Sequence, residues 1–179
     1  MSDQTHEAEA TIGSKIRAIP NYPKPGITFR DITPLLKDGA AFSKCIDLLA
    51  DSVSGYQFDY ISGIEARGFI IASALAYKLR KGFIPIRKKG KLPFDKISKN
   101  YTLEYGTETI EMHKDSVEAG SQVLIVDDLL ATGGTASTAA EMIRNLGADV
   151  AGFAFIVELS ALNGRVKLGN HRISSLIKY

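Results

Sequence analysis

Two adjacent carboxylates followed by a short glycine-rich loop are the residues of this sequence with the clearest chemistry. Asp127 and Asp128 follow the apolar run 123–126, and the loop 131–135 reads Ala-Thr-Gly-Gly-Thr. Glycines allow such a loop to turn its backbone N–H groups toward one point, and Thr135 can cap a helix that follows. Backbone donors at a helix N-terminus bind anions, and phosphate is the best match. The loop is therefore a candidate phosphate site.

The two carboxylates are suited to a different task. Side chains of consecutive strand residues point in divergent directions, so we expect Asp127 and Asp128 not to share one proton as a catalytic acid pair does. They can instead accept hydrogen bonds from the vicinal hydroxyls of a sugar or hold a hydrated divalent cation. A phosphate loop beside hydroxyl acceptors describes a pocket for ribose 5-phosphate. A plain turn between a strand and a helix is the simpler alternative, which the complete order of 123–135 disfavours.

Three further positions could contact a phosphorylated ligand. Arg67 begins a predicted helix just after a strand, where its planar guanidinium would suit a second phosphate group, although a surface ion pair is the alternative. The segment 87–99 holds six cations against one aspartate. It is either a solvated loop or a basic lid that closes over a polyanion. Phe29 follows the Pro/Gly-rich turn 21–26 and is either a core residue or a platform for a planar base.

The elements around these residues predict an α/β fold. The run 123–126 is apolar without alternation, which is typical of a parallel strand buried on both faces. Ligands bind at the carboxyl ends of the strands in such a sheet. Strands are expected at 27–32, 59–63, 82–86, 123–126, 150–157 and 172–177, an antiparallel pair at 101–105 and 109–113, helices at 5–19, 39–55, 67–79 and 135–146, and helix or loop at 158–168. This order favours a mainly parallel central sheet with helices on both faces.

Length and composition fit one compact domain. The chain has 179 residues, 45% of them hydrophobic, and a chain of this length buries roughly 70% of its unfolded surface. Its one cysteine, Cys45, excludes an internal disulfide and is expected in the core, and its three scattered histidines give no zinc-binding spacing. Acids precede any apolar run, and no run reaches the about 20 residues of a membrane span. We expect a cytoplasmic protein that binds neither membrane nor, with a net charge of +2, nucleic acid.

The motif 123–135 resembles the phosphoribosyl pyrophosphate (PRPP) binding motif of type I phosphoribosyltransferases, and Leu129-Leu130 within it is most similar to the adenine phosphoribosyltransferase version. The similarity extends from Tyr22 to Tyr179. Five segments look like those of this family, in its order: 23–36, 65–69, 87–93, 103–106 and 123–135. The resemblance implies the type I phosphoribosyltransferase fold as a single domain over 1–179. It also implies a small N-terminal helix and base-binding hood at 1–34 and a flexible β lid with a rim hairpin at 87–113.

The resemblance further implies the transfer of a phosphoribosyl group from PRPP to adenine, giving AMP and pyrophosphate in purine salvage, usually by a homodimer. The 5′-phosphate would be held by Ala131, Thr132, Gly133, Gly134 and Thr135. The ribose hydroxyls would be bound by Asp127 and Asp128, and the pyrophosphate by Arg67, Lys88 and Lys91. Adenine would stack on Phe29, and its edge would be read by the backbone of Thr28 and Arg30. The catalytic residues would be Arg67 and Glu104, the latter as the acid/base group. Mg²⁺ would be held mainly by PRPP and water, near the two aspartates.

Two other functions are weighed against this one. A phosphoribosyltransferase for a 6-oxopurine or another base would need a side-chain donor opposite the base carbonyl, whereas the segment around Phe29 is of the adenine type. A PRPP-sensing regulator that binds nucleic acid would carry an added domain or a wide basic face. Here the basic residues concentrate in 87–99, and Glu104 is present, which favours catalysis.

Overall fold

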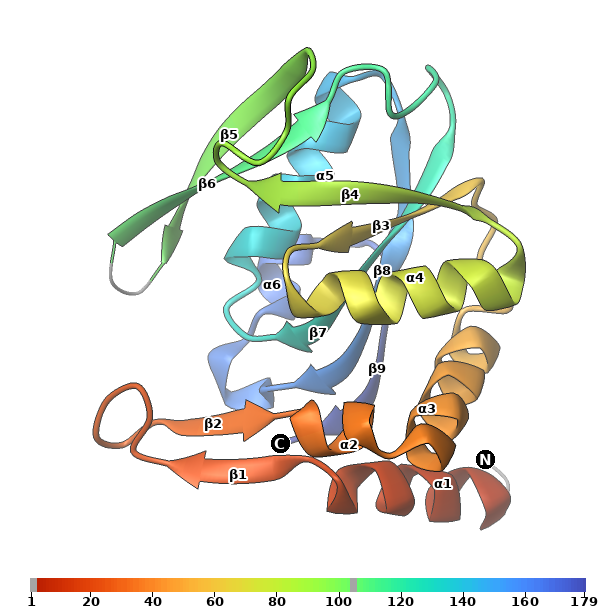
Figure 1. Cartoon of the computed structure of the whole chain (residues 1–179), viewed down its shortest axis with the longest axis vertical. Helices are drawn as coiled ribbons and strands as arrows, with labels where there is room; N and C mark the ends of the chain where they lie inside the picture. The colour runs from red at the N-terminus through yellow and green to blue at the C-terminus, as the bar shows by residue number, and fades with distance from the viewer. Residues whose placement is uncertain (1–2, 104–105) are drawn as a thin grey trace.

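A seven-stranded sheet forms the centre of the molecule (Figure 1). The structure is a computed structural model and describes residues 3–103 and 106–179. The strand order is β5-β6-β4-β3-β7-β8-β9. The parallel strands are β3 (Tyr60–Ile64), β4 (Gly82–Lys88), β7 (Gln122–Leu130), β8 (Asp149–Glu158) and β9 (Ile173–Lys178). An antiparallel hairpin of β5 (Lys96–Leu103) and β6 (Gly106–His113) completes one edge. The expected mainly parallel sheet is confirmed.

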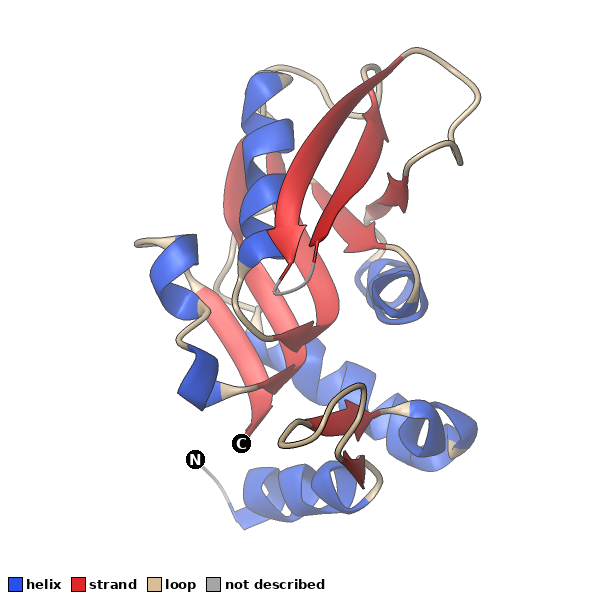
Figure 2. Cartoon of the chain, turned by 90° about the vertical axis from the view of Figure 1, so that its left-hand side faces the viewer, coloured by secondary structure: helices blue, strands red, loops and turns tan. Residues whose placement is uncertain are grey.

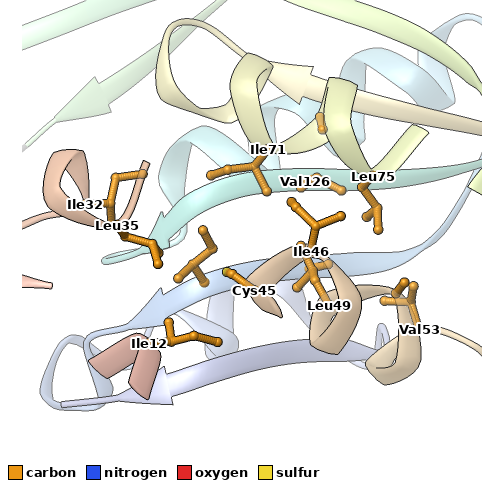
Figure 3. Close-up of a cluster of buried hydrophobic side chains, with 14 of the residues drawn as sticks. Ile12, Ile32, Leu35, Cys45, Ile46, Leu49, Val53, Ile71, Leu75 and Val126 are labelled. Carbon is orange, nitrogen blue, oxygen red and sulfur yellow. The ribbon is translucent and has the colours of Figure 1, made fainter. Parts of the chain in front are cut away.

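Helices cover both faces of this sheet, as the unbroken apolar run of β7 requires. Leu124 and Val126 of β7 belong to a buried cluster to which α1 (Asp3–Ser14), α3 (Gly39–Ser52) and α4 (Arg67–Leu79) contribute, and Figure 3 shows side chains of α3 and α4 beside Val126. Val123 and Ile125 face the opposite way, toward α5 (Gly134–Asn145). Cys45 of α3 is fully buried in the first cluster, as expected. Among the described residues, no helix is both long and apolar enough to cross a membrane.

The N-terminal region differs from the sequence expectation. The helix expected over 5–19 ends at Ser14, and Arg17–Pro20 form β1, which pairs antiparallel with β2 (Thr28–Asp31). The turn between them, 21–26, has Asn21 and Gly26 at positive φ, and the Gly26 N–H donates to the Asn21 side chain. Pairing with a strand beyond the turn therefore overrides the helical spacing of the apolar residues. Figure 2 shows this small sheet apart from the central one.

The basic segment 87–99 is only partly a loop, because both of its ends belong to strands. Arg87 and Lys88 end β4 and β5 begins at Lys96, so the connection is only 89–95. Acidic partners neutralise several of its cations: Arg87 pairs with Glu65, Lys88 with Glu108, Lys96 with Glu111 and Lys99 with Glu141. These acids lie outside the segment, so counting charges along it overstated its basic character.

Two further differences concern element bounds. β7 continues to Leu130, so Asp127 and Asp128 lie inside a strand and not just beyond its end. The short helix α2 (Thr33–Lys37) was not expected. The segment expected as helix or loop, 158–168, contains the 3₁₀ turn η1 (Ser160–Leu162) and the short helix α6 (Arg165–Leu168).

Candidate functional site

A polar cavity of about 340 Å³ lies at the carboxyl ends of β3, β4 and β7. It is lined by residues of these strands, of the loop before α4, of the hairpin and of α5: Ile64, Glu65, Ala66, Arg67, Lys88, Tyr101, Glu108, Asp127, Asp128 and Thr135. The sequence predicted five of its lining residues as site residues: Arg67, Lys88, Asp127, Asp128 and Thr135. The structure thus brings together cations and carboxylates that are far apart in the chain.

The paired aspartates of β7 are held in a defined arrangement. The backbone N–H of Asp128 donates to Asp127 Oδ1 across 2.9 Å. A Cβ atom on Gly68 would lie only 2.6 Å from that same oxygen, so the second residue of α4 must be a glycine for Asp127 to fit. Burial and the charge of Asp128 raise the pKa of Asp127 well above its usual range. The two carboxyl groups therefore interact through their charges, whereas the sequence expectation concerned only the sharing of one proton.

Arg67 occupies the N-terminal end of α4 and faces the aspartates. Its Nε lies 2.6 Å from Asp128 Oδ2, and its guanidinium carbon lies 5.2 Å from the centre of the Phe29 ring. Asp128 is only 5% exposed, so this ion pair belongs to the cavity and not to the surface. The pair is poorly aligned, because Oδ2 accepts no hydrogen bond of good geometry from any described residue. A buried carboxylate oxygen without a hydrogen bond is a suitable acceptor for a sugar hydroxyl or a metal-bound water.

The glycine-rich loop connects β7 to α5 in the way an anion site requires. Gly133 is the N-cap of α5 with φ of 78°, and no side chain caps the helix. Thr135 therefore lies in the first turn and is not the cap, which corrects that expectation. The uncapped first turn leaves backbone N–H groups for an outside acceptor. Such a turn binds a phosphate group well, because the helix dipole adds to its donors.

Two residues of the hairpin that the sequence did not single out complete the polar cavity. The Tyr101 hydroxyl donates to Glu108 across 2.8 Å, and Lys88 Nζ lies 3.3 Å from the same carboxylate. Burial, reinforced by this hydrogen bond, raises the pKa of Tyr101 to about 12. The cross-strand register pairs Tyr101 with Glu108. The pair depends on the register in which Leu103 lies opposite Gly106, and no local spacing in the sequence indicates that register.

A second, apolar cavity of about 310 Å³ lies between β2 and the glycine-rich loop. Its lining comprises Pro23, Ile27, Thr28, Phe29, Arg30, Leu129, Ala131, Thr132, Leu159 and Leu162. Phe29 is half-buried and meets Tyr22 edge to face at 5.4 Å, so it belongs to a cavity wall and not to the main core. Ala131 and Thr132 face this cavity while Thr135 faces the polar one. The loop therefore joins the two cavities.

Residues 32–173 match the family model described as the phosphoribosyl transferase domain. The chain belongs to the phosphoribosyltransferase family. The adenine phosphoribosyltransferase of Thermotoga neapolitana is 54% identical over 92% of this chain and 96% of that protein. The crystal structure of adenine phosphoribosyltransferase from Thermoanaerobacter pseudethanolicus has a TM-score of 0.93 at 50% identity, over 96% of this chain and 99% of that one. The Saccharomyces cerevisiae enzyme, complexed with an imino-altritol bisphosphate and adenine, has a TM-score of 0.89 at 38% identity, over 96% and 99%.

These findings confirm the resemblance and the fold inferred from the sequence of this phosphoribosyltransferase. Among the expected site residues that the structure describes, Gly133, Gly134 and Lys91 line neither cavity. Lys91 is exposed in the connection 89–95, where its carbonyl accepts from Arg87 Nη1 at 3.1 Å. Glu104 lies outside the described residues. The roles of both stay predictions.

Proposed function

We propose that this phosphoribosyltransferase transfers the 5-phosphoribosyl group of PRPP to adenine, forming AMP and pyrophosphate as a step of purine salvage. The observation that carries the proposal is the pair of adjoining cavities. One is apolar and bounded by an aromatic ring, as a flat base requires, and the other holds paired carboxylates and cations, as PRPP requires. The relatives named adenine phosphoribosyltransferase, and the adenine in the yeast complex, support the same base.

The site residues divide between the parts of the substrates. The loop 131–135 binds the 5′-phosphate with backbone N–H groups, and Asp127 and Asp128 accept hydrogen bonds from the ribose hydroxyls. Arg67, Lys88 and Lys91 bind the pyrophosphate. Phe29 stacks on adenine, and the backbone of Thr28 and Arg30 reads its edge. The wall position of Phe29 and the uncapped start of α5 support these roles.

The reaction forms a bond from a purine nitrogen to C1′ of the ribose and breaks the bond from C1′ to the pyrophosphate oxygen, which leaves with the electron pair. Positive charge develops on the ribose and negative charge on the leaving group. Fixed cations such as Arg67 and Lys88 lower the barrier if their contacts strengthen as that charge grows. The purine nitrogen gives up a proton, and the carboxylate of Glu104 is a suitable acceptor.

Mg²⁺ fits this site as an ion shared with the substrate. No group of three or more histidine, cysteine or acidic side chains that could hold a metal occurs in the described part of the chain. Mg²⁺ keeps several waters when it binds substrate phosphates, and the buried Asp128 oxygen, which accepts no hydrogen bond from the described residues, would accept one from such a water. Asp127 and Asp128 would hold it through water, and when bound it would neutralise charge on the pyrophosphate.

The remaining assignments follow the family. The chain acts in the cytoplasm as one domain over 1–179, with the hood at 1–34 and the lid and rim hairpin at 87–113, and it forms a homodimer. Exposed apolar side chains on α4, with Ile70 46% and Tyr77 89% exposed, support an interface between subunits. Neither nucleic acid nor membrane is a partner.

Pyrophosphate release measured in parallel with adenine, hypoxanthine, guanine and orotate tests the function. We expect release with adenine alone. Equal or faster release with hypoxanthine or guanine would assign the enzyme to 6-oxopurines, and PRPP binding without release for any base would assign it to the sensing regulators.

Glu104 has its own test. Glu104→Gln keeps the shape of the side chain but cannot accept the purine proton, so we expect kcat to fall at least tenfold while Kd for adenine and PRPP stays within threefold. Unchanged turnover would remove Glu104 from the mechanism. Glu118→Gln, which alters an exposed glutamate outside both cavities, is the control.

A further inference from the structure

The backbone of the glycine-rich loop lies directly against a turn that is about thirty residues later in the chain. A Cβ atom on Gly164 would lie 2.2 Å from the Ala131 carbonyl oxygen and 3.1 Å from the Gly133 nitrogen. In the other direction, a Cβ atom on Gly133 would lie 2.4 Å from the Gly164 carbonyl oxygen. The nearest neighbour is a backbone oxygen on each side, so rotation of a side chain cannot relieve either contact. Neither position has room for a methyl group unless the loop or the turn moves.

The turn that carries Gly164 is held by side-chain hydrogen bonds to strands β8 and β9. Asn163 has a positive φ of 51°. The next side chain, Arg165, donates to both carboxylate oxygens of Glu158 at 2.7 Å, and to Ser175 Oγ at 3.1 Å. Glu158 is 6% exposed and lies at the end of β8, where it pairs with Leu130 of β7. A bidentate pair of this kind, with the carboxylate buried and the guanidinium partly exposed, has one preferred geometry. The turn therefore has little freedom to yield to the loop.

The same stretch of chain also forms part of the apolar cavity. Leu159 and Leu162 line that cavity, and Gly164 follows Leu162 by two residues. The segment 159–165 therefore touches the wall of the cavity for the base and the back of the loop that joins both cavities. It is well placed to hold that loop in one shape.

We propose that Gly164 is a positioning residue for the 5′-phosphate site. The turn 163–165, clamped by Glu158, supports the loop 131–135 from behind and sets the directions of its backbone N–H groups. A glycine-rich loop has many accessible conformations, and a rigid support keeps it in the one that binds. The inference deepens the proposed function, because it rests on the loop 131–135 binding the 5′-phosphate.

Gly164→Ala tests the inference through two ligands that differ only in the phosphate. The affinities of AMP and adenosine are measured by calorimetry for the wild type and the variant. In the wild type we expect AMP to bind much more tightly than adenosine. In Gly164→Ala we expect the affinity for AMP to fall at least tenfold and that for adenosine to stay within threefold. Gly55→Ala is the matched control, because a Cβ atom there meets no atom within 4 Å.

Glu158→Gln provides a second approach that leaves both glycines in place. Loss of the charge weakens the clamp on Arg165, so we expect the same selective loss for AMP, about three- to fivefold, in a protein whose circular dichroism matches the wild type. Equal losses for AMP and adenosine in both variants would show a general structural role and overturn the inference. An unchanged AMP affinity in a folded Gly164→Ala would overturn it as well. If the wild type does not distinguish AMP from adenosine, the phosphate site itself is wrong and the proposed function fails first.

Discussion

Arg67 Nε lies 2.6 Å from Asp128 Oδ2, and the same guanidinium lies over the face of Phe29 at 5.2 Å. One side chain thus contacts the carboxylate proposed for the ribose and the ring proposed for the base, while it is itself proposed for the pyrophosphate. The three parts of the substrates meet at this arginine. Its planar guanidinium can donate two parallel hydrogen bonds to one phosphate group, whereas an ammonium group acts as a point charge.

Arg67→Ala should therefore weaken phosphate binding far more than base binding. We expect Kd for PRPP and pyrophosphate to rise at least tenfold, which is about 1.4 kcal/mol, and Kd for adenine to change less than threefold. Calorimetry with the three ligands measures this directly. Arg144→Ala, which removes an exposed guanidinium outside both cavities, is the control. An equal loss for adenine would indicate that Arg67 supports Phe29 and does not act on the pyrophosphate.

Asp127 should reduce stability at neutral pH. Burial and the charge of Asp128 raise its pKa in the folded state, so the folded protein holds this proton more tightly than the unfolded chain does. A raised pKa contributes stability that is complete below the unfolded value and is lost as the pH rises through the folded value. Asp127 therefore destabilises the folded state at neutral pH relative to low pH, where the group is protonated in both states. Asparagine keeps the oxygen that accepts from the Asp128 N–H and removes the charge.

We expect Asp127→Asn to raise the free energy of unfolding at pH 7 and to lose this advantage below about pH 4, near the ordinary pKa of aspartate. Urea unfolding at both pH values measures the difference, and the exposed Asp51→Asn on α3 is the control. The same variant should bind AMP less tightly, because an NH2 donor replaces one of the carboxyl oxygens that accept from the ribose hydroxyls. A variant less stable than the wild type at pH 7 would show that the carboxylate stabilises the fold.

The sequence predicted most of the central sheet because burial there follows local patterns. The unbroken apolar run of β7 and the apolar spacing of α3 reflect directly which faces are covered. The element bounds that were predicted wrongly depend on pairing between segments that are separated in the sequence. β1 exists because Arg17–Pro20 pair with Thr28–Asp31, and no window of the sequence that ends at Pro20 contains that partner.

The features of the candidate site also divide into those that local sequence predicts and those that depend on the fold. Asp127, Asp128 and the loop 131–135 were predicted because their order along the chain carries the chemistry. The contact of Tyr101 with Glu108 depends on the register of a hairpin, and the contact of Gly133 with Gly164 depends on the packing of two distant turns. These contacts follow from the fold and could not be derived from local spacing.

Glu108 should moderate the binding of pyrophosphate by Lys88. Its carboxylate lies 3.3 Å from Lys88 Nζ and is held there by the Tyr101 hydroxyl. Glu108→Gln leaves the cation without a neutralising charge. Since a partly exposed pair is worth about 0.2–1 kcal/mol, we expect pyrophosphate to bind about two- to fivefold more tightly. Salt should reduce this gain through screening.

Calorimetric titration of pyrophosphate at two ionic strengths measures the effect of Glu108→Gln. The matched control is the same change in a Lys88→Gln background, where it should have no effect on pyrophosphate. A gain that persists without Lys88 would place the action of Glu108 elsewhere. Weaker binding in the single variant would mean that the carboxylate positions Lys88 and does not compete with the ligand.

Tyr179 should hold the Arg30 side chain away from the base. The Arg30 guanidinium carbon lies 3.6 Å from the centre of the Tyr179 ring, and its buried Nε has no hydrogen-bond partner among the described residues. The Tyr179 backbone is fixed in turn, because its N–H donates to the Glu158 carbonyl and its carbonyl accepts from Ser160, both at 2.9 Å. The ring therefore acts as a fixed surface under Arg30, the one charged side chain among the described residues that line the apolar cavity.

We expect Tyr179→Leu to raise Kd for adenine about two- to fivefold, since a cation–π contact near the surface is worth about 0.5–1 kcal/mol, and to leave kcat within twofold. Tyr179→Phe keeps the ring face and should bind adenine as the wild type does. In an Arg30→Met background the leucine substitution should add nothing, because the cation that needs the ring is gone. Additive losses in the double variant would show that Tyr179 supports β2 as a whole, and a loss in Tyr179→Phe would assign the effect to the hydroxyl group.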